Sequence, residues 1–366
     1  MTLAGHPDHL PSHAAPNPAA LRATLVACLL CIGMVSGIVP AFAAPSAMRH
    51  HPWVAGAFLA PPIGPGSGRL EAWSSGTALT KTVQFAAPKT LQGNSFFVAY
   101  DALRHSIYIP TLAGRTYIVG SRAFKPVGSF ASIKGARVAA VSPDHRELLV
   151  LSPRQTAAYS IVGHERLYVL PFGGNAIAFD ARTNRAFIGG NPSNRITEID
   201  VASGKTLRTL PVGHPGDMIW ANGKLFSADM KTGVMTVFDP ATNRITRIRT
   251  PEVDPHFTYQ RIPQATAGFM QLAADPAHHR VYAAGFSGHI LAFSSHTRPR
   301  YLGEVAVRAN PHVDKLSGLA VIDHGRDALV TVENLKTAVV VRLSDGAIKQ
   351  TLPGIASNRW VRLAAD

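Results

Sequence analysis

Short apolar segments separated by turn-forming residues recur along most of the chain. The clearest unit, Phe179 to Gly213, contains four of them, ending at Phe179 or covering 186–188, 195–199 and 206–210. Asn184-Arg185 and Ser203-Gly204-Lys205 separate neighbouring segments, and such residues favour tight turns. Segments this short, apolar or alternating, are typical of β-strands. The pattern therefore predicts a unit of four antiparallel strands.

This unit has counterparts along the chain. An apolar or turn-forming residue followed by Asp or Asn marks the expected end of each first strand, at Asp101, Asp144, Asp180, Asn222, Asp275, Asp323 and Asp366. A β-rich pair follows each of the first six marks, as in Tyr108-Ile109 and Leu329-Val330, and successive marks lie 36 to 53 residues apart. A four-stranded propeller blade needs about 40–50 residues. The repeats predict an all-β, seven-bladed antiparallel β-propeller.

The last repeat begins at the C-terminus, where residues 360–363 supply only one strand. Residues 53–59, 69–74 and 80–85 offer the three strands that are missing. We therefore expect the N- and C-terminal strands to share one blade, because such pairing removes two open sheet edges. An open β-solenoid or two sandwiches are the alternatives.

An export signal precedes the repeats. Arg22 is followed by an apolar run that Pro40 ends, and Ala41 and Ala43 are small residues at the recognition positions. This is the pattern of a cleaved secretory signal peptide. We expect a signal at 1–43, with an unusually long N-terminal region, and a single propeller domain at 44–366. An uncleaved membrane anchor is the alternative.

Composition narrows the chemistry of the mature chain. Both cysteines, Cys28 and Cys31, lie within the expected signal, which excludes disulfides, zinc–thiolate sites and cysteine nucleophiles from the mature part. The formal net charge is +14, which favours binding of polyanions such as nucleic acid or envelope phosphates. No later segment is apolar enough to cross a membrane, so we expect a periplasmic or secreted monomer.

Two repeats resemble a known family. Ile196–Lys205 reads ITEIDVASGK and Val234–Asn243 reads VMTVFDPATN, while Val212–Gly216 reads VGHPG between them. These motifs resemble those of the YVTN-type bacterial propellers, which are WD40-like in architecture. The family includes surface-layer and periplasmic proteins of unknown role, lactonase-like hydrolases and nucleic-acid binders, so the resemblance implies a fold more than a function.

Ligands of propellers are expected at the mouth of the central channel, lined by the loops that enter each first strand. The residues expected to bind a ligand there are His214, Asp217, Asp254, His256, Tyr259, Arg261, His312, Asp314, Asn358 and Arg359. Tyr259 and Arg261 belong to the longest entry loop, which could form a lid.

Three of these entry loops each combine an imidazole with a carboxylate. Convergence of His214, His256 and His312 would create a Zn²⁺ site. Asn191, Asp229 and Glu333 form an alternative set of oxygen ligands, suited to Ca²⁺ on the axis. Ordinary turn capping by the same residues is the competing interpretation.

Three functions remain open. The first is an extracytoplasmic binding or scaffold propeller whose partner is a small molecule or a protein, because no intact catalytic motif is present. The second is a lactonase-like or other metal-assisted hydrolase that uses the His/Asp loops. The third is polyanion binding, which the charge favours.

Overall fold

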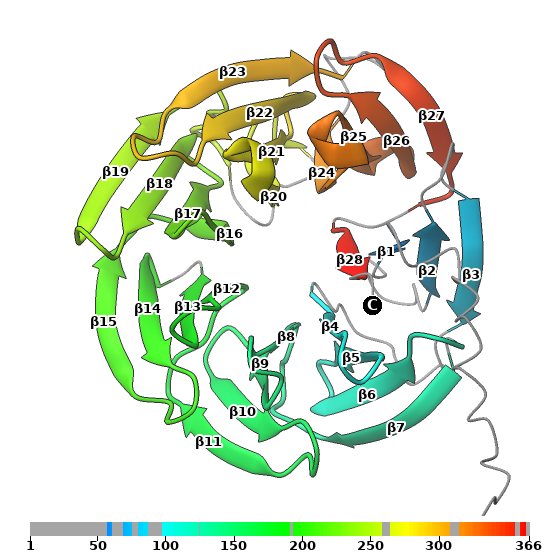
Figure 1. The fold of residues 1–366 in the computed structure, drawn as a ribbon, viewed down its shortest axis with the longest axis vertical. Helices are drawn as coiled ribbons and strands as arrows, with labels where there is room; N and C mark the ends of the chain where they lie inside the picture. Colours follow the sequence, from blue (N-terminus) through cyan, green and yellow to red (C-terminus); the bar gives the residue numbers. More distant parts are fainter. Residues whose placement is uncertain are drawn as a thin grey trace, which may run out of the picture. The chain divides into compact units, whose positions relative to one another are not determined.

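The computed structural model describes residues 97–363, with gaps at 124, 191–192, 258–263, 308–314 and 356–358, and the backbone of three strands between residues 57 and 86. The expected signal lies outside this part. Residues 50–366 form one compact unit whose described secondary structure is β-strands and short 3-10 helices. Four-stranded antiparallel sheets stand around a common centre in Figure 1, so the chain is a β-propeller, as predicted.

Six blades each consist of four consecutive strands, ordered from the centre outward. The first contains β4 (Ala99–Asp101), β5 (Ser106–Pro110), β6 (Arg115–Gly120) and β7 (Lys125–Ala131). The second contains β8 (Val138–Val141), β9 (Glu147–Leu151), β10 (Thr156–Ser160) and β11 (Arg166–Leu170). The third contains β12 (Ala176–Asp180), β13 (Arg185–Gly190), β14 (Arg195–Asp200) and β15 (Thr206–Pro211).

The other three blades follow the same order. The fourth contains β16 (Pro215–Ala221), β17 (Lys224–Asp229), β18 (Val234–Asp239) and β19 (Arg244–Arg249). The fifth contains β20 (Phe269–Asp275), β21 (Arg280–Gly285), β22 (His289–Ser294) and β23 (Tyr301–Ala306). The sixth contains β24 (Leu316–Ile322), β25 (Asp327–Val332), β26 (Thr337–Arg342) and β27 (Ile348–Pro353). The 3-10 helices in the described part of the chain are η4 (Pro276–His278), η5 (Asp323–Gly325) and η6 (Glu333–Leu335).

The six blades of consecutive strands are one fewer than the seven blades predicted. A further four-stranded sheet, in the order β28-β1-β2-β3, combines the two ends of the chain. It contains β28 (Val361–Leu363), β1 (Ala57–Ala60), β2 (Arg69–Ser74) and β3 (Thr80–Ala86). β1 pairs antiparallel with β28, with Leu59 opposite Val361. The predicted pairing of the terminal strands is confirmed.

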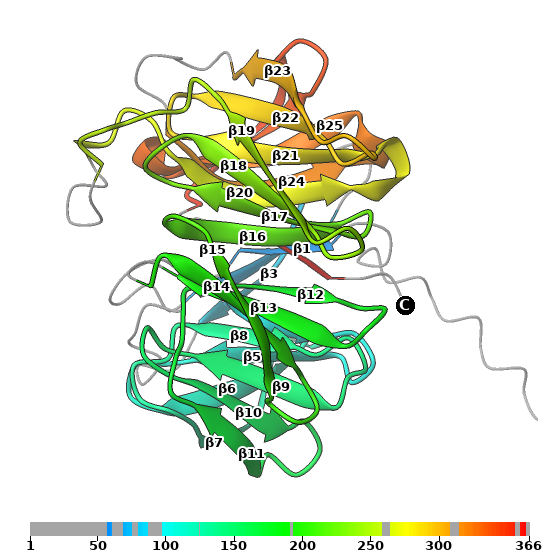
Figure 2. The ribbon, with the colours of Figure 1, turned by 90° about the vertical axis from the view of Figure 1, so that its left-hand side faces the viewer.

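Each interface between neighbouring blades has its own apolar layer. Phe226, Phe269 and Phe293, for example, pack where the fourth and fifth blades meet. Second strands such as β9 and β25 are buried along their whole length, because a blade covers each of their faces. Outer strands such as β7 are mostly exposed. Figure 2 shows the blades stacked face to face with their outer strands at the rim.

The turns between first and second strands also join neighbouring blades. Asp101 is fully buried, and its Oδ1 accepts a hydrogen bond from the backbone N–H of Leu103 at 3.0 Å. The same carboxylate contacts Nδ1 of His145, in the next blade, at 2.7 Å and Nη1 of Arg104 at 3.0 Å. His145 has a φ of 58°. In the following joint, Nδ2 of Asn184 (φ 50°) donates to Oδ2 of Asp144 at 3.0 Å.

The substitution Asp101→Ala tests this joint. It leaves the N–H of Leu103 and the side chains of Arg104 and His145 without their shared acceptor, so we expect the free energy of unfolding to fall by about 2–4 kcal/mol. Asp345→Ala removes an exposed carboxylate that also pairs with an arginine, Arg342. This control should change the free energy of unfolding by less than about 0.5 kcal/mol. Urea denaturation measures both, and equal effects would contradict the joint.

Candidate functional site

Two of the predicted ligand-binding residues bind each other near the centre of the ring. Asp217, in β16, is almost completely buried; its Oδ1 accepts a hydrogen bond from Nη2 of Arg359 at 3.0 Å, and its Oδ2 accepts one from the backbone N–H of Leu272 at 2.8 Å. The Arg359 guanidinium also lies 3.4 Å from the ring centroid of Phe97. Burial lowers the pKa of Arg359, and Asp217 opposes that shift. Both oxygens of Asp217 therefore serve contacts within the protein.

Gln271 holds the residue next to Arg359. From β20, its Oε1 accepts hydrogen bonds from the backbone N–H groups of Trp360, at 2.7 Å, and Leu319, at 2.9 Å, while its Nε2 donates to the Trp360 carbonyl at 2.8 Å. The Trp360 side chain is buried against the sixth blade. Sequence reasoning missed Gln271, since a single buried glutamine in a strand carries no motif. These contacts tie the segment before β28 to the fifth and sixth blades.

Asp254 organises the long entry loop of the fifth blade. Its Oδ1 accepts a hydrogen bond from the backbone N–H of His256 at 2.9 Å, and its Oδ2 accepts one from that of Thr266 at 3.0 Å. His256 is exposed, whereas Phe257 packs with Met230 in an apolar cluster over the ends of the fourth and fifth blades. The Asp254 carboxylate thus joins the two ends of the loop.

His214 and Asp229 lie at the same end of the fourth blade, because Pro215 is paired with Asp229. Oδ1 of Asp229 accepts hydrogen bonds from the backbone N–H groups of Lys231 and Thr232 at 2.9 and 3.0 Å, the geometry of an Asx turn. His214 adopts a φ of 36°, and its Nδ1 is buried without a hydrogen-bond partner among the described residues. Oε2 of Glu333 is the other atom of a predicted metal ligand that is buried without a hydrogen-bond partner among the described residues.

Glu333 lies in η6 on the same face, where its backbone N–H donates to the Lys315 carbonyl at 2.9 Å. Burial raises the pKa of Glu333 and lowers the pKa of Lys315, and each charge opposes the shift of the other. The remaining predicted site residues fall outside the described part of the chain: Asn191, Tyr259, Arg261, His312, Asp314 and Asn358. Their roles stay predictions.

Glu252 centres a polar cluster that the sequence did not indicate. It is buried in the connection before β20; its Oε1 accepts hydrogen bonds from the backbone N–H groups of Gly268 and Ser287 at 2.8 and 3.1 Å, and its Oε2 accepts one from the Ser287 hydroxyl. Nδ1 of His289 lies 3.1 Å from that hydroxyl and 3.0 Å from the Ser287 carbonyl oxygen. Because a carbonyl only accepts, Nδ1 carries the proton and cannot deprotonate Ser287. In this arrangement the imidazole of His289 does not act as a base toward Ser287, and the cluster braces the loop.

Within the described ranges, no three His, Cys, Asp or Glu side chains are grouped so that they could hold a metal ion. In the same part of the chain, no helix has the length and apolar character needed to span a membrane. No protein-family model matches the sequence. No curated protein matches it either.

Solved structures show the class of protein. A functionally unknown protein from Desulfotomaculum acetoxidans is 10% identical with a TM-score of 0.65, and the match covers 85% of this chain and 100% of that one. Kuenenia stuttgartiensis hydrazine synthase is 11% identical with a TM-score of 0.61, covering 74% of this chain and 93% of that one. The WD40 repeats of RRP9 are 9% identical with a TM-score of 0.59, covering 74% and 84%. At these identities the likeness supports a WD40-like β-propeller fold and nothing finer.

Replacing Glu252 tests the polar cluster. Burial raises the pKa of Glu252, so the folded state holds the proton more tightly than the unfolded state, and its contribution to stability declines as pH rises through the folded-state pKa. Glu252→Gln keeps an acceptor and does not titrate. We expect its unfolding free energy, relative to the natural chain, to increase from about pH 4 toward neutral pH.

Glu252→Ala is the companion variant. It leaves the N–H groups of Gly268 and Ser287 unpaired, and we expect a loss of about 2–4 kcal/mol across the same pH range. Chemical denaturation at several pH values measures all three proteins. A Gln variant that becomes relatively less stable as pH rises would contradict a buried carboxyl that favours its protonated form.

Proposed function

We propose that this chain is an extracytoplasmic β-propeller that acts as a binding or scaffold protein, without chemistry of its own at the entry loops. The observation that carries the proposal is that the carboxylates of the entry loops and adjoining turns already accept hydrogen bonds from the protein itself. Asp217 binds Arg359 and Leu272, Asp254 binds both ends of its loop, and Asp229 caps a turn. A general base or metal ligand needs a free oxygen directed at the substrate or ion, whereas both oxygens of Asp217 and Asp254 and Oδ1 of Asp229 accept hydrogen bonds from the protein.

The proposal includes closure of the ring. We propose that the β28-β1-β2-β3 sheet serves as the seventh blade, since β28 contacts β4 of the first blade and the Trp360 side chain packs against the sixth blade. Export and membership of the YVTN-type propellers belong to the proposal as well. The signal-like pattern from Arg22 to Ala43 and the motifs of the third and fourth blades support them.

The metal-assisted hydrolase is the second candidate, and one observation favours it. Nδ1 of His214, which is buried without a hydrogen-bond partner among the described residues, could bind Zn²⁺ if His256 and His312 approached it. A Ca²⁺ site at Asn191, Asp229 and Glu333 is less favoured, because the Asx turn already uses one oxygen of Asp229.

A hydrolysis assay separates the two candidates. Purified mature protein is offered a panel of lactones and aryl esters with and without Zn²⁺ or Ca²⁺, beside the variant His214→Ala/His256→Ala/His312→Ala. A binding protein should hydrolyse no substrate faster than this variant does. Metal-dependent hydrolysis that disappears in the variant would overturn the proposal and establish the hydrolase.

A further inference from the structure

Two adjoining clefts lie on the face opposite the entry loops. One, of about 420 Å³, is formed by the turns β20–β21 and β22–β23 of the fifth blade. The other, of about 430 Å³, lies between the fourth blade and the β22–β23 turn. Thr297 and Arg298 line both clefts, so the two clefts adjoin at these residues, and together they are called the groove.

The groove is strongly basic. Five Lys or Arg side chains line it against one carboxylate, that of Asp239: Lys224, Arg244, Arg280, Arg298 and Arg300. Oδ1 of Asp239 already accepts hydrogen bonds from the backbone N–H groups of Ala241 and Thr242 at 3.0 and 3.4 Å. No ion pair found in the described part of the chain joins Arg244, Arg298 or Arg300 to a carboxylate. The lining thus carries an excess of positive charge, which attracts anions.

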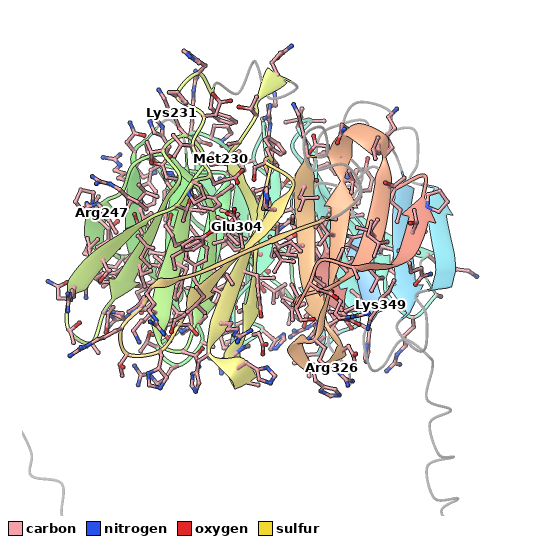
Figure 3. All side chains as sticks on the ribbon, turned by 90° about the horizontal axis from the view of Figure 1, so that it is seen from above. Met230, Lys231, Arg247, Glu304, Arg326 and Lys349 are labelled. Atoms are coloured by element: carbon pink, nitrogen blue, oxygen red, sulfur yellow. The ribbon has the colours of Figure 1, made fainter. Side chains whose placement is uncertain are left out.

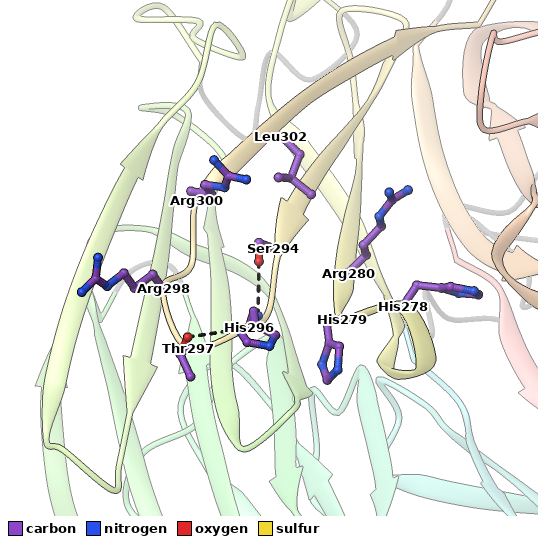
Figure 4. Close-up of a pocket in the computed structure, with 9 residues that line it drawn as sticks. All are labelled: His278, His279, Arg280, Ser294, His296, Thr297, Arg298, Arg300 and Leu302. Atoms are coloured by element: carbon purple, nitrogen blue, oxygen red, sulfur yellow. Dashed lines mark hydrogen bonds between the residues drawn. The ribbon is translucent and has the colours of Figure 1, made fainter.

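Histidines and hydroxyl groups line the first cleft between its arginines (Figure 4). The rings of His279 and His296 meet edge to face, with centroids 5.0 Å apart, and Nδ1 of His296 lies 3.0 Å from the Thr297 hydroxyl oxygen. His279 is held at a φ of 52° at the end of η4. In Figure 4, Arg298 and Arg300 stand on one side of the histidine pair and Arg280 on the other.

We propose that this groove binds a linear phosphate chain, a polyphosphate-type anion that runs from one cleft into the other. Guanidinium groups match phosphate oxygens with two parallel hydrogen bonds, and the imidazole and hydroxyl groups add further donors. No Phe, Tyr or Trp is among the described residues that line the groove, and bases of single-stranded nucleic acid need such platforms for stacking. A phosphate chain without bases therefore fits the groove better than single-stranded nucleic acid does.

Calorimetric titration with tripolyphosphate tests the proposal on the mature protein. Arg298→Ala should weaken binding by about tenfold or more, because Arg298 lines both clefts and its removal takes away charged hydrogen bonds to the phosphate chain. Arg298→Lys keeps the charge, so its affinity for tripolyphosphate should lie between that of the natural chain and that of Arg298→Ala. Arg326→Ala is the matched control, since Arg326 lies on the same face, pairs with Asp323 at 2.7 Å and does not line the groove (Figure 3). Orthophosphate should bind more weakly than tripolyphosphate.

Several results would overturn the assignment. These are no binding of tripolyphosphate, an equal loss in Arg326→Ala, binding of poly-glutamate as tight as that of tripolyphosphate, or tighter binding of a single-stranded oligonucleotide. Arg298 is exposed, so its variants should melt at the temperature of the natural chain. The groove lies away from the entry loops, so this result does not depend on the hydrolysis assay.

Discussion

The hydrogen bonds between Gln271 and Trp360 are the interaction on which the proposed closure of the ring depends. A propeller made of consecutive blades has two ends, and each would expose the apolar face of a blade to water. Gln271 reaches from β20 to both backbone groups of Trp360 and to the N–H of Leu319. Arg359 adds a buried ion pair to Asp217. These contacts fix the segment that precedes β28 to the fourth, fifth and sixth blades, and β28 itself pairs with β1.

The rest of the ring repeats one arrangement. Apolar layers lie between neighbouring blades, and turn residues such as Asp101 and Asp144 join the first blade to the second and the second to the third. Buried carboxylates in this arrangement are costly unless several donors meet them. Asp101, Asp217 and Glu252 each accept hydrogen bonds from at least two donors, so these buried carboxylates stabilise the assembly of the blades. The proposed binding surfaces lie instead on the exposed turns.

Much of the fold could be predicted from the sequence because its determinants are local. Residues 69–74 were predicted as a strand and form β2, and Asp101, Asp180 and Asp275 end first strands as expected. The site could be predicted less well. Asp217 and Arg359 are 142 positions apart, and no local pattern reveals that they pair. The basic groove likewise combines Lys224 with Arg300, which only the stacking of blades brings to one surface.

Native-state hydrogen exchange of the Trp360 amide tests the closure most directly. That amide donates to Gln271, as does the amide of Leu319. If the C-terminal segment closes the ring, both amides exchange only through global unfolding, with the same free energy as the buried Val330 amide in β25. A Trp360 amide that exchanges with a free energy lower by more than about 2 kcal/mol would show a terminus that opens alone, and would contradict the account.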